Sequence, residues 1–263
     1  MIYFFAQGIF TFVLYEISEF MGKSKTKSKS NSKGKKKPKK NQNKYFELLI
    51  IAGIVFFTIL FWNTIIIYPV KLFVILLHEI SHAFAAFFTG GKVDVIKINY
   101  YLGGVTITEG GNRLLIASAG YLGSLFFGSA LFVSSYNQKL SKYICTTVAV
   151  VLLIFTANIL QGSATILSAL FFAALLFLSP RYFSKTVHSY LMKTIGLISA
   201  LYVLTDIKDD ILFGSDRITD ARLLESITGV PSIVFGLFWL GISASVVFLL
   251  IRHSYAKGIK ISK

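Results

Sequence analysis

The residues best suited to chemistry are His78, Glu79 and His82, which lie in an otherwise apolar stretch at 71–88. Residues four apart share one helical face, with Cβ atoms about 5–6 Å apart, so both imidazoles can bind one zinc ion at about 2.0–2.1 Å. Glu79 can then act as general base, taking a proton from the attacking water and returning it to the leaving amine. The spacing therefore predicts a zinc peptidase site of the HExxH type.

Chance and structural roles compete poorly with this interpretation. An HExxH pattern would arise by coincidence in about one of 700 chains of this length and composition. A charged group at the centre of a membrane span costs about 2.5–3.5 kcal/mol, so three ionisable residues there need a partner. The structural alternative is a pair of core histidines bonded to carbonyls or a serine, with Glu79 paired to a lysine. It explains neither the spacing nor the apolar surroundings.

A third protein ligand usually completes a catalytic zinc site. The apolar stretch at 187–213 ends with Asp206, Asp209 and Asp210 at i, i+3 and i+4, on one helical face where a cation would relieve their repulsion. Asp206 lies deepest in the span and is the favoured ligand. Asp209 and Asp210 are alternative ligands or supporting groups, or are simply solvated beside Lys208 at the interface.

These residues belong to a chain with the composition of a membrane protein. Of the 263 residues, 54% are apolar and 15% charged, and the mean hydropathy is +0.67, whereas soluble domains carry about 25% charged residues. Seven apolar stretches come close to the roughly 20 residues that cross a bilayer, at 46–67, 69–88, 113–135, 143–160, 163–179, 187–213 and 231–251. We expect an integral multi-pass protein of an endomembrane or of the plasma membrane.

The segment 91–110 differs from the spans around it. Its β-branched residues alternate in part around Gly103-Gly104, which predicts a hairpin. The expected fold is therefore all-α and polytopic, with about seven transmembrane helices and a short membrane-associated β-hairpin after the HExxH helix.

The remaining segments are expected to lie outside the membrane core. Residues 1–21 are apolar but short for a span, which predicts an interfacial segment or short anchor. Residues 22–44 hold 11 lysines and no acid, which predicts a disordered cytosolic tract attracted to anionic lipid. No aromatic residue interrupts that tract, so we expect no nucleic acid partner. The peptidase-like domain then covers 45–252, followed by a basic tail at 253–263.

A cytosolic lysine tract would place His82 and Asp206 in the cytosolic half of the membrane, at nearly equal depths. The basic tail favours the opposite orientation, but the match in depth holds either way.

The chain resembles the site-2 protease type of intramembrane zinc metallopeptidase, and especially a fungal and plant branch of peptidase-like membrane proteins, in the order and content of several short motifs. The shared pieces are HEISHA at 78–83, TGGKV at 89–93, GGVT at 103–106, AGYLGS at 119–124, DIKDD at 206–210, SD at 215–216, and GVP with GLFW within 229–239. The resemblance implies that one zinc ion is bound by His78, His82 and Asp206, and that Glu79 is the catalytic base. The better-studied site-2 proteases carry the third ligand in a Leu-Asp-Gly context, whereas Asp206 lies in Thr-Asp-Ile-Lys.

The predicted function is hydrolysis of peptide bonds in membrane-spanning substrates. The resemblance implies that the hairpin lies beside the substrate, and Val105, Thr106 and Ile107 form the strand with which an extended substrate could pair. The alternative from another class is a catalytically inactive scaffold that keeps the peptidase fold. A transporter with a proton-relay glutamate is a third reading, but no pair of broken half-helices supports it.

Overall fold

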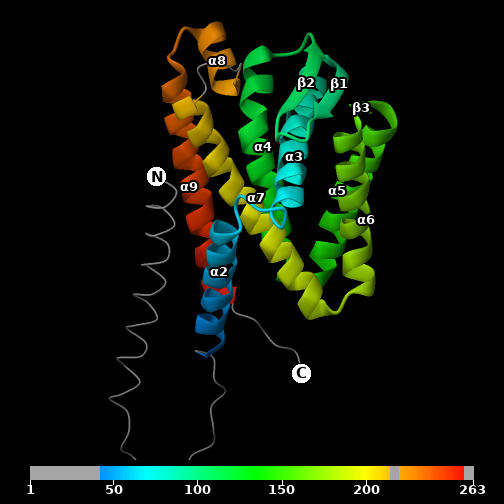
Figure 1. Cartoon of the computed structure of the whole chain (residues 1–263), viewed down its shortest axis with the longest axis vertical. Coiled ribbons are helices and arrows are strands. Elements are labelled where there is room, and N and C mark those ends of the chain that lie inside the picture. Colours follow the sequence, from blue (N-terminus) through cyan, green and yellow to red (C-terminus); the bar gives the residue numbers. More distant parts are fainter. Residues whose placement is uncertain (1–41, 214–218, 258–263) are drawn as a thin grey trace, which may run out of the picture. The chain divides into compact units, whose positions relative to one another are not determined.

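The structure is a computed structural model that describes residues 42–213 and 219–257, without the side chains of 42–46 and 209–213. The predicted N-terminal segment, most of the lysine tract and the end of the basic tail lie outside these residues. The elements in chain order are α2 (Gln42–Leu60), α3 (Tyr68–Phe88), β1 (Lys92–Ile98), β2 (Gly104–Glu109), α4 (Arg113–Ser134), α5 (Gln138–Asn158), β3 (Leu160–Gln161), α6 (Ser163–Tyr182), α7 (Lys185–Phe213), α8 (Asp220–Thr228) and α9 (Ser232–Lys257) (Figure 1).

The described helices confirm a multi-pass membrane protein. Six of them, α3 to α7 and α9, are long and apolar enough to cross a bilayer. The first predicted stretch, 46–67, differs from the structure: α2 ends at Leu60, and the chain turns at 61–67 before α3 begins. Asparagines begin two of the spans: Asn112 and Asn137 accept hydrogen bonds from the exposed amides of the first turns of α4 and α5.

The chain divides into two compact units. Of the described residues, one unit holds 42–60 and 249–257, and in it the Ser254 hydroxyl donates to the buried Glu47 carboxylate at 3.4 Å. The other unit, 61–248, contains the HExxH helix, the hairpin and α8.

The core of unit 61–248 forms where α3 packs against its neighbours. Phe73 of α3 is fully buried and stacks on Phe172 of α6, with ring centroids 4.2 Å apart. On another face, α4 comes close to α3 because Gly123 has no side chain: a Cβ there would overlap the Ser81 hydroxyl. Small residues at such crossings let helix backbones approach inside a membrane.

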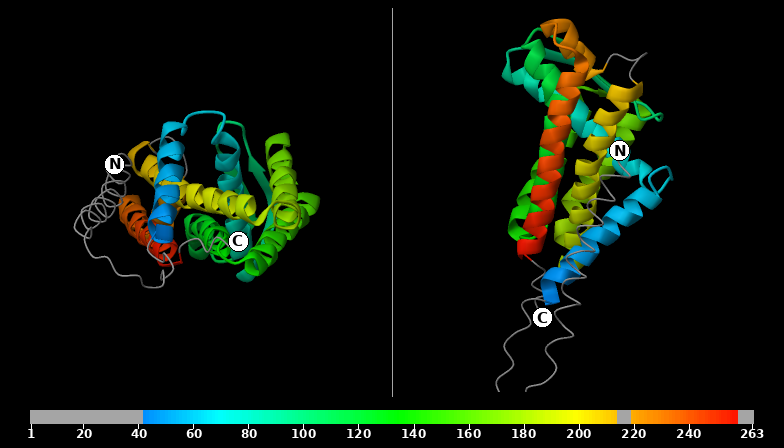
Figure 2. Two further views of the ribbon diagram at one scale, coloured as in Figure 1. Left: turned by 90° about the horizontal axis from the view of Figure 1, so that it is seen from below. Right: turned by 90° about the vertical axis from the view of Figure 1, so that its left-hand side faces the viewer.

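The predicted hairpin is present and lies along most of α3, with β1 antiparallel to the helix and β2 returning beside β1. At one end Gly91 N–H donates to Ala86 O at 2.8 Å, and at the hairpin tip the Tyr68 hydroxyl donates to Tyr100 O at 2.6 Å. The two strands pair antiparallel, and β3 adds a short parallel strand, giving the order β2-β1-β3. The sheet lies between α3 and the α5–α6 pair (Figure 2). It therefore shares the bilayer depth of a spanning helix.

Helix α8 is short, amphipathic and was not predicted as a separate element. The Thr219 hydroxyl accepts from Arg222 N, and Gly229 ends the helix at φ 74°, a left-handed conformation that suits glycine. The Glu225 carboxylate then accepts from Ser232 N at 3.1 Å, which ties α8 to the start of α9. These local bonds fix the direction of the α8 N-terminus, where Asp220 lies.

Candidate metal centre

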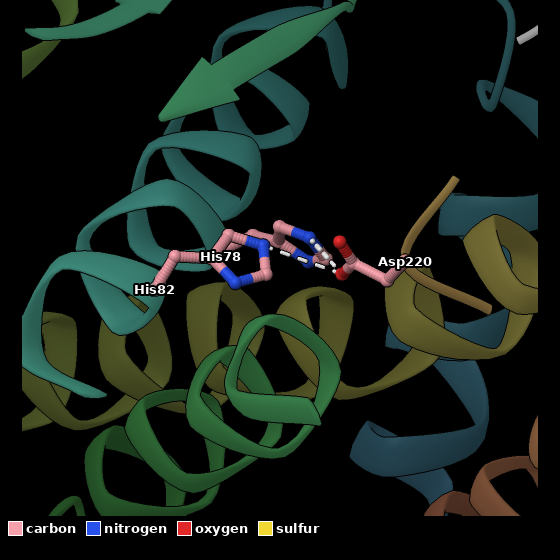
Figure 3. A group of neighbouring side chains, drawn as sticks. All are labelled: His78, His82 and Asp220. Carbon is pink, nitrogen blue, oxygen red and sulfur yellow. Dashed lines mark ion pairs between the residues drawn. The ribbon is translucent and has the colours of Figure 1, made fainter. Parts of the chain in front are cut away.

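Two histidines of α3 and one aspartate of α8 converge (Figure 3). The rings of His78 and His82 lie one helical turn apart, with centroids separated by 4.8 Å. Asp220 Oδ2 lies 3.0 Å from Nε2 of His78 and 3.3 Å from Nε2 of His82. All three ligand atoms lie within 4.8 Å of one another, and the three side chains are largely buried.

This donor set fits a tetrahedral zinc ion. Two ligands at about 2.0–2.1 Å from a tetrahedral metal lie about 3.3 Å apart, close to the two histidine–aspartate distances. Asp220 Oδ2 is buried and accepts no hydrogen bond from the described residues. Burial raises the pKa of Asp220, but the adjacent imidazoles, His82 and then His78, outweigh that effect and lower it below its usual range. With a metal bound, the charge of the ion would keep the carboxylate ionised, as a metal ligand must be.

The other nitrogen of each histidine faces an acceptor. Nδ1 of His82 lies 2.6 Å from Ile116 O, and since a carbonyl can only accept, Nδ1 carries the proton and Nε2 keeps its lone pair for a metal. Nδ1 of His78 faces Oδ2 of Asp206 at 4.0 Å. Both rings thus present Nε2 to the same point.

Gly120 of α4 leaves the space that the ion needs. A Cβ on Gly120 would overlap Nε2 of His78 and lie 2.6 Å from Nε2 of His82. Beside it, the Tyr121 ring lies edge-on to the His78 ring, with centroids 5.1 Å apart. It also contacts the buried Trp239 of α9, with ring centroids 4.9 Å apart. The glycine opens the site and the aromatic pair encloses it.

Glu79 is buried and is held by the hairpin. The Thr106 hydroxyl lies 2.7 Å from Glu79 Oε2 and 3.0 Å from Glu79 O. Gly104 faces the same carboxylate, because a Cβ there would overlap Glu79 Oε1. The hairpin is therefore in direct contact with the residue expected to act as the base.

The predicted site residues differ in where they lie. Asp206 lies beside Nδ1 of His78, on the side of the ring away from the predicted metal. Asp220, not Asp206, lies beside the Nε2 atoms of His78 and His82. The side chains of Asp209 and Asp210 lie outside the described residues. Val105 and Ile107 are exposed on β2, flanking Thr106. Asp220 was missed; its sequence signal is a carboxylate directly after Thr219, a good helix N-cap, close to the shared SD pair at 215–216.

Fold and site together define a multi-pass membrane protein of the metallopeptidase class. The family model Peptidase M50B-like matches residues 50–250, and the chain belongs to this site-2 protease-like family of zinc metallopeptidases. Neither the comparison with curated proteins nor that with solved structures found a match.

Proposed function

We propose that this protein is a zinc-dependent intramembrane peptidase that hydrolyses peptide bonds of membrane-spanning substrates. The observation that carries the proposal is the convergence of His78, His82 and Asp220 beside Glu79, at the depth of a spanning helix. Burying four ionisable groups in one part of a membrane protein is costly unless they perform a function.

In this proposal His78, His82 and Asp220 hold one zinc ion. When bound, the ion would polarise the scissile carbonyl and lower the pKa of the attacking water. Asp206 does not bind the metal but faces Nδ1 of His78, where its charge favours the ring orientation that directs Nε2 to the site. Carboxylates in this position typically raise the affinity of a histidine for its metal.

Glu79 acts as the general base. It accepts a proton from the attacking water and gives it to the leaving amine as the peptide bond breaks, so one carboxylate serves both transfers. Its burial excludes bulk water, which strengthens its interactions with the reacting groups.

The outer edge of β2 at residues 105–107 is the proposed substrate site. An intact transmembrane helix hides its carbonyls, so the substrate must unwind locally before attack. Among the described residues β2 pairs with β1 alone, so its other edge is open. Unpaired backbone groups at bilayer depth are unfavourable, and an extended substrate strand would satisfy them. Val105 and Ile107 on the exposed face would then lie beside the docked strand.

The second candidate is an inactive scaffold that keeps the fold. Unlike a peptidase, such a scaffold needs no catalytic base. The test uses purified protein in detergent with a transmembrane peptide substrate, comparing wild type with Glu79→Gln. The amide preserves size but cannot take up the proton, so we expect loss of cleavage with zinc retained. Cleavage by Glu79→Gln would refute the peptidase mechanism, and absence of cleavage by zinc-loaded wild type on a panel of such peptides would favour the scaffold.

A further inference from the structure

Thr106 contacts Glu79 through its side chain, and its backbone forms part of the open edge of the sheet. Its hydroxyl lies 2.7 Å from Glu79 Oε2 and 3.0 Å from the backbone carbonyl of the same residue. Glu79 is only 6% exposed, so bulk water has little access to it. Both contacts cross from β2 to α3.

The register of the sheet decides where the Thr106 backbone points. Ile96 N–H donates to Ile159 O, on the β3 side of β1, so the polar backbone groups of Ile96 face away from β2. Thr106 is the antiparallel partner of Ile96. In such a non-hydrogen-bonded pair both residues direct N–H and C=O outward, so Thr106 presents its own to the open edge of β2.

We infer that Thr106 is a positioning residue that links substrate pairing to the orientation of the base. The inference rests on the proposed function: a substrate strand that bonds the Thr106 backbone fixes β2, and β2 fixes Glu79 through the hydroxyl. Docking and base orientation therefore meet at a single residue.

A purely structural role, holding the hairpin against α3, is the competing explanation. The hairpin has other attachments that do not involve Thr106, including Tyr68 to Tyr100 O and Ile98 N–H to the Thr165 hydroxyl at 2.9 Å. Loss of one hydroxyl should therefore leave the hairpin in place.

The test compares three variants of the full chain: Thr106→Val, Thr106→Ser and Thr108→Val. Valine keeps the shape and backbone of threonine but removes the donor, while serine keeps the donor. Thr108 is the matched control, because it is the same residue type on the same strand and makes no side-chain hydrogen bond among the described residues. Zinc content and melting temperature are measured for each, together with kcat and KM on one transmembrane peptide.

We expect Thr106→Val to lower kcat by roughly 10- to 100-fold, the effect of losing a hydrogen bond to a charged group. KM should stay within about twofold, since the backbone groups that pair with substrate remain. Thr106→Ser should restore most of kcat, and Thr108→Val should resemble wild type. Zinc content should be equal in all.

Full kcat in Thr106→Val, while Glu79→Gln is inactive, would overturn the inference and leave the proposed function standing. A lower melting temperature with no selective loss of kcat would assign Thr106 the structural role instead. An inactive wild type would overturn the proposed function and this inference with it.

Discussion

Gly120→Ala should abolish zinc binding without weakening the helix that carries it. Alanine within a helix is favoured over glycine by about 0.5–1 kcal/mol, so α4 itself should be stabilised. The added Cβ would lie 2.6 Å from Nε2 of His82, which is 0.8 Å short of the 3.4 Å at which ordinary contact begins, and it would overlap Nε2 of His78. Metal–ligand distances tolerate only about 0.2 Å, so a shift large enough to relieve the overlap removes the site. We expect zinc affinity to fall by roughly 100-fold or more.

The assay for Gly120→Ala is zinc per chain by elemental analysis after dialysis against a weak chelator, with melting temperature measured in parallel. Gly241→Ala is the matched control: Gly241 is also helical, but a Cβ there meets nothing within 4 Å. The control should retain wild-type zinc. Full zinc occupancy in Gly120→Ala would refute the reasoning, because the ion could not then lie against the α4 backbone.

Two further predictions separate chemistry from folding. Gly104→Ala should keep its zinc but lose most of its peptidase activity, since the new Cβ displaces the Glu79 carboxylate; unchanged kcat would contradict the contact between β2 and the base. Phe73→Ala should destabilise the protein by about 2 kcal/mol, taking about 100 Å³ of removed ring at ~24 cal/mol per Å³, because in a membrane the cavity rather than transfer from water sets the cost. Its zinc content in the folded state should be normal, and chemical denaturation in detergent measures the change.

The features that the sequence predicted well depend on local patterns. The apolar lengths predicted the spans, and alternation around Gly103-Gly104 predicted the hairpin, which the structure has at Lys92–Ile98 and Gly104–Glu109. The i, i+4 spacing of His78 and His82 needs only helix geometry to bring the rings together. Each of these signals lies within about 20 residues of sequence.

The features that could not be predicted from the sequence depend on contacts between residues far apart in the chain. Asp220 reaches His78 across more than 140 residues of chain, from a nine-residue helix outside the apolar stretches. Thr219 and Gly229 mark the ends of that helix, but no local signal says where it docks. The matched depths of His82 and Asp206 favoured the apolar stretch at 187–213 as the source of the third ligand. The same limit applies to Thr106, whose contact with Glu79 depends on how the hairpin lies along α3.

The central claim is that His78, His82 and Asp220 form one zinc site. Its most direct test is zinc per chain in wild type, Asp220→Ala and Asp206→Ala, purified in one detergent and confirmed to be folded. We predict one zinc in wild type, almost none in Asp220→Ala, and a retained but weaker site in Asp206→Ala, with affinity lower by roughly 10- to 100-fold. Full zinc in Asp220→Ala together with its loss in Asp206→Ala would contradict the account and move the third ligand from α8 to α7.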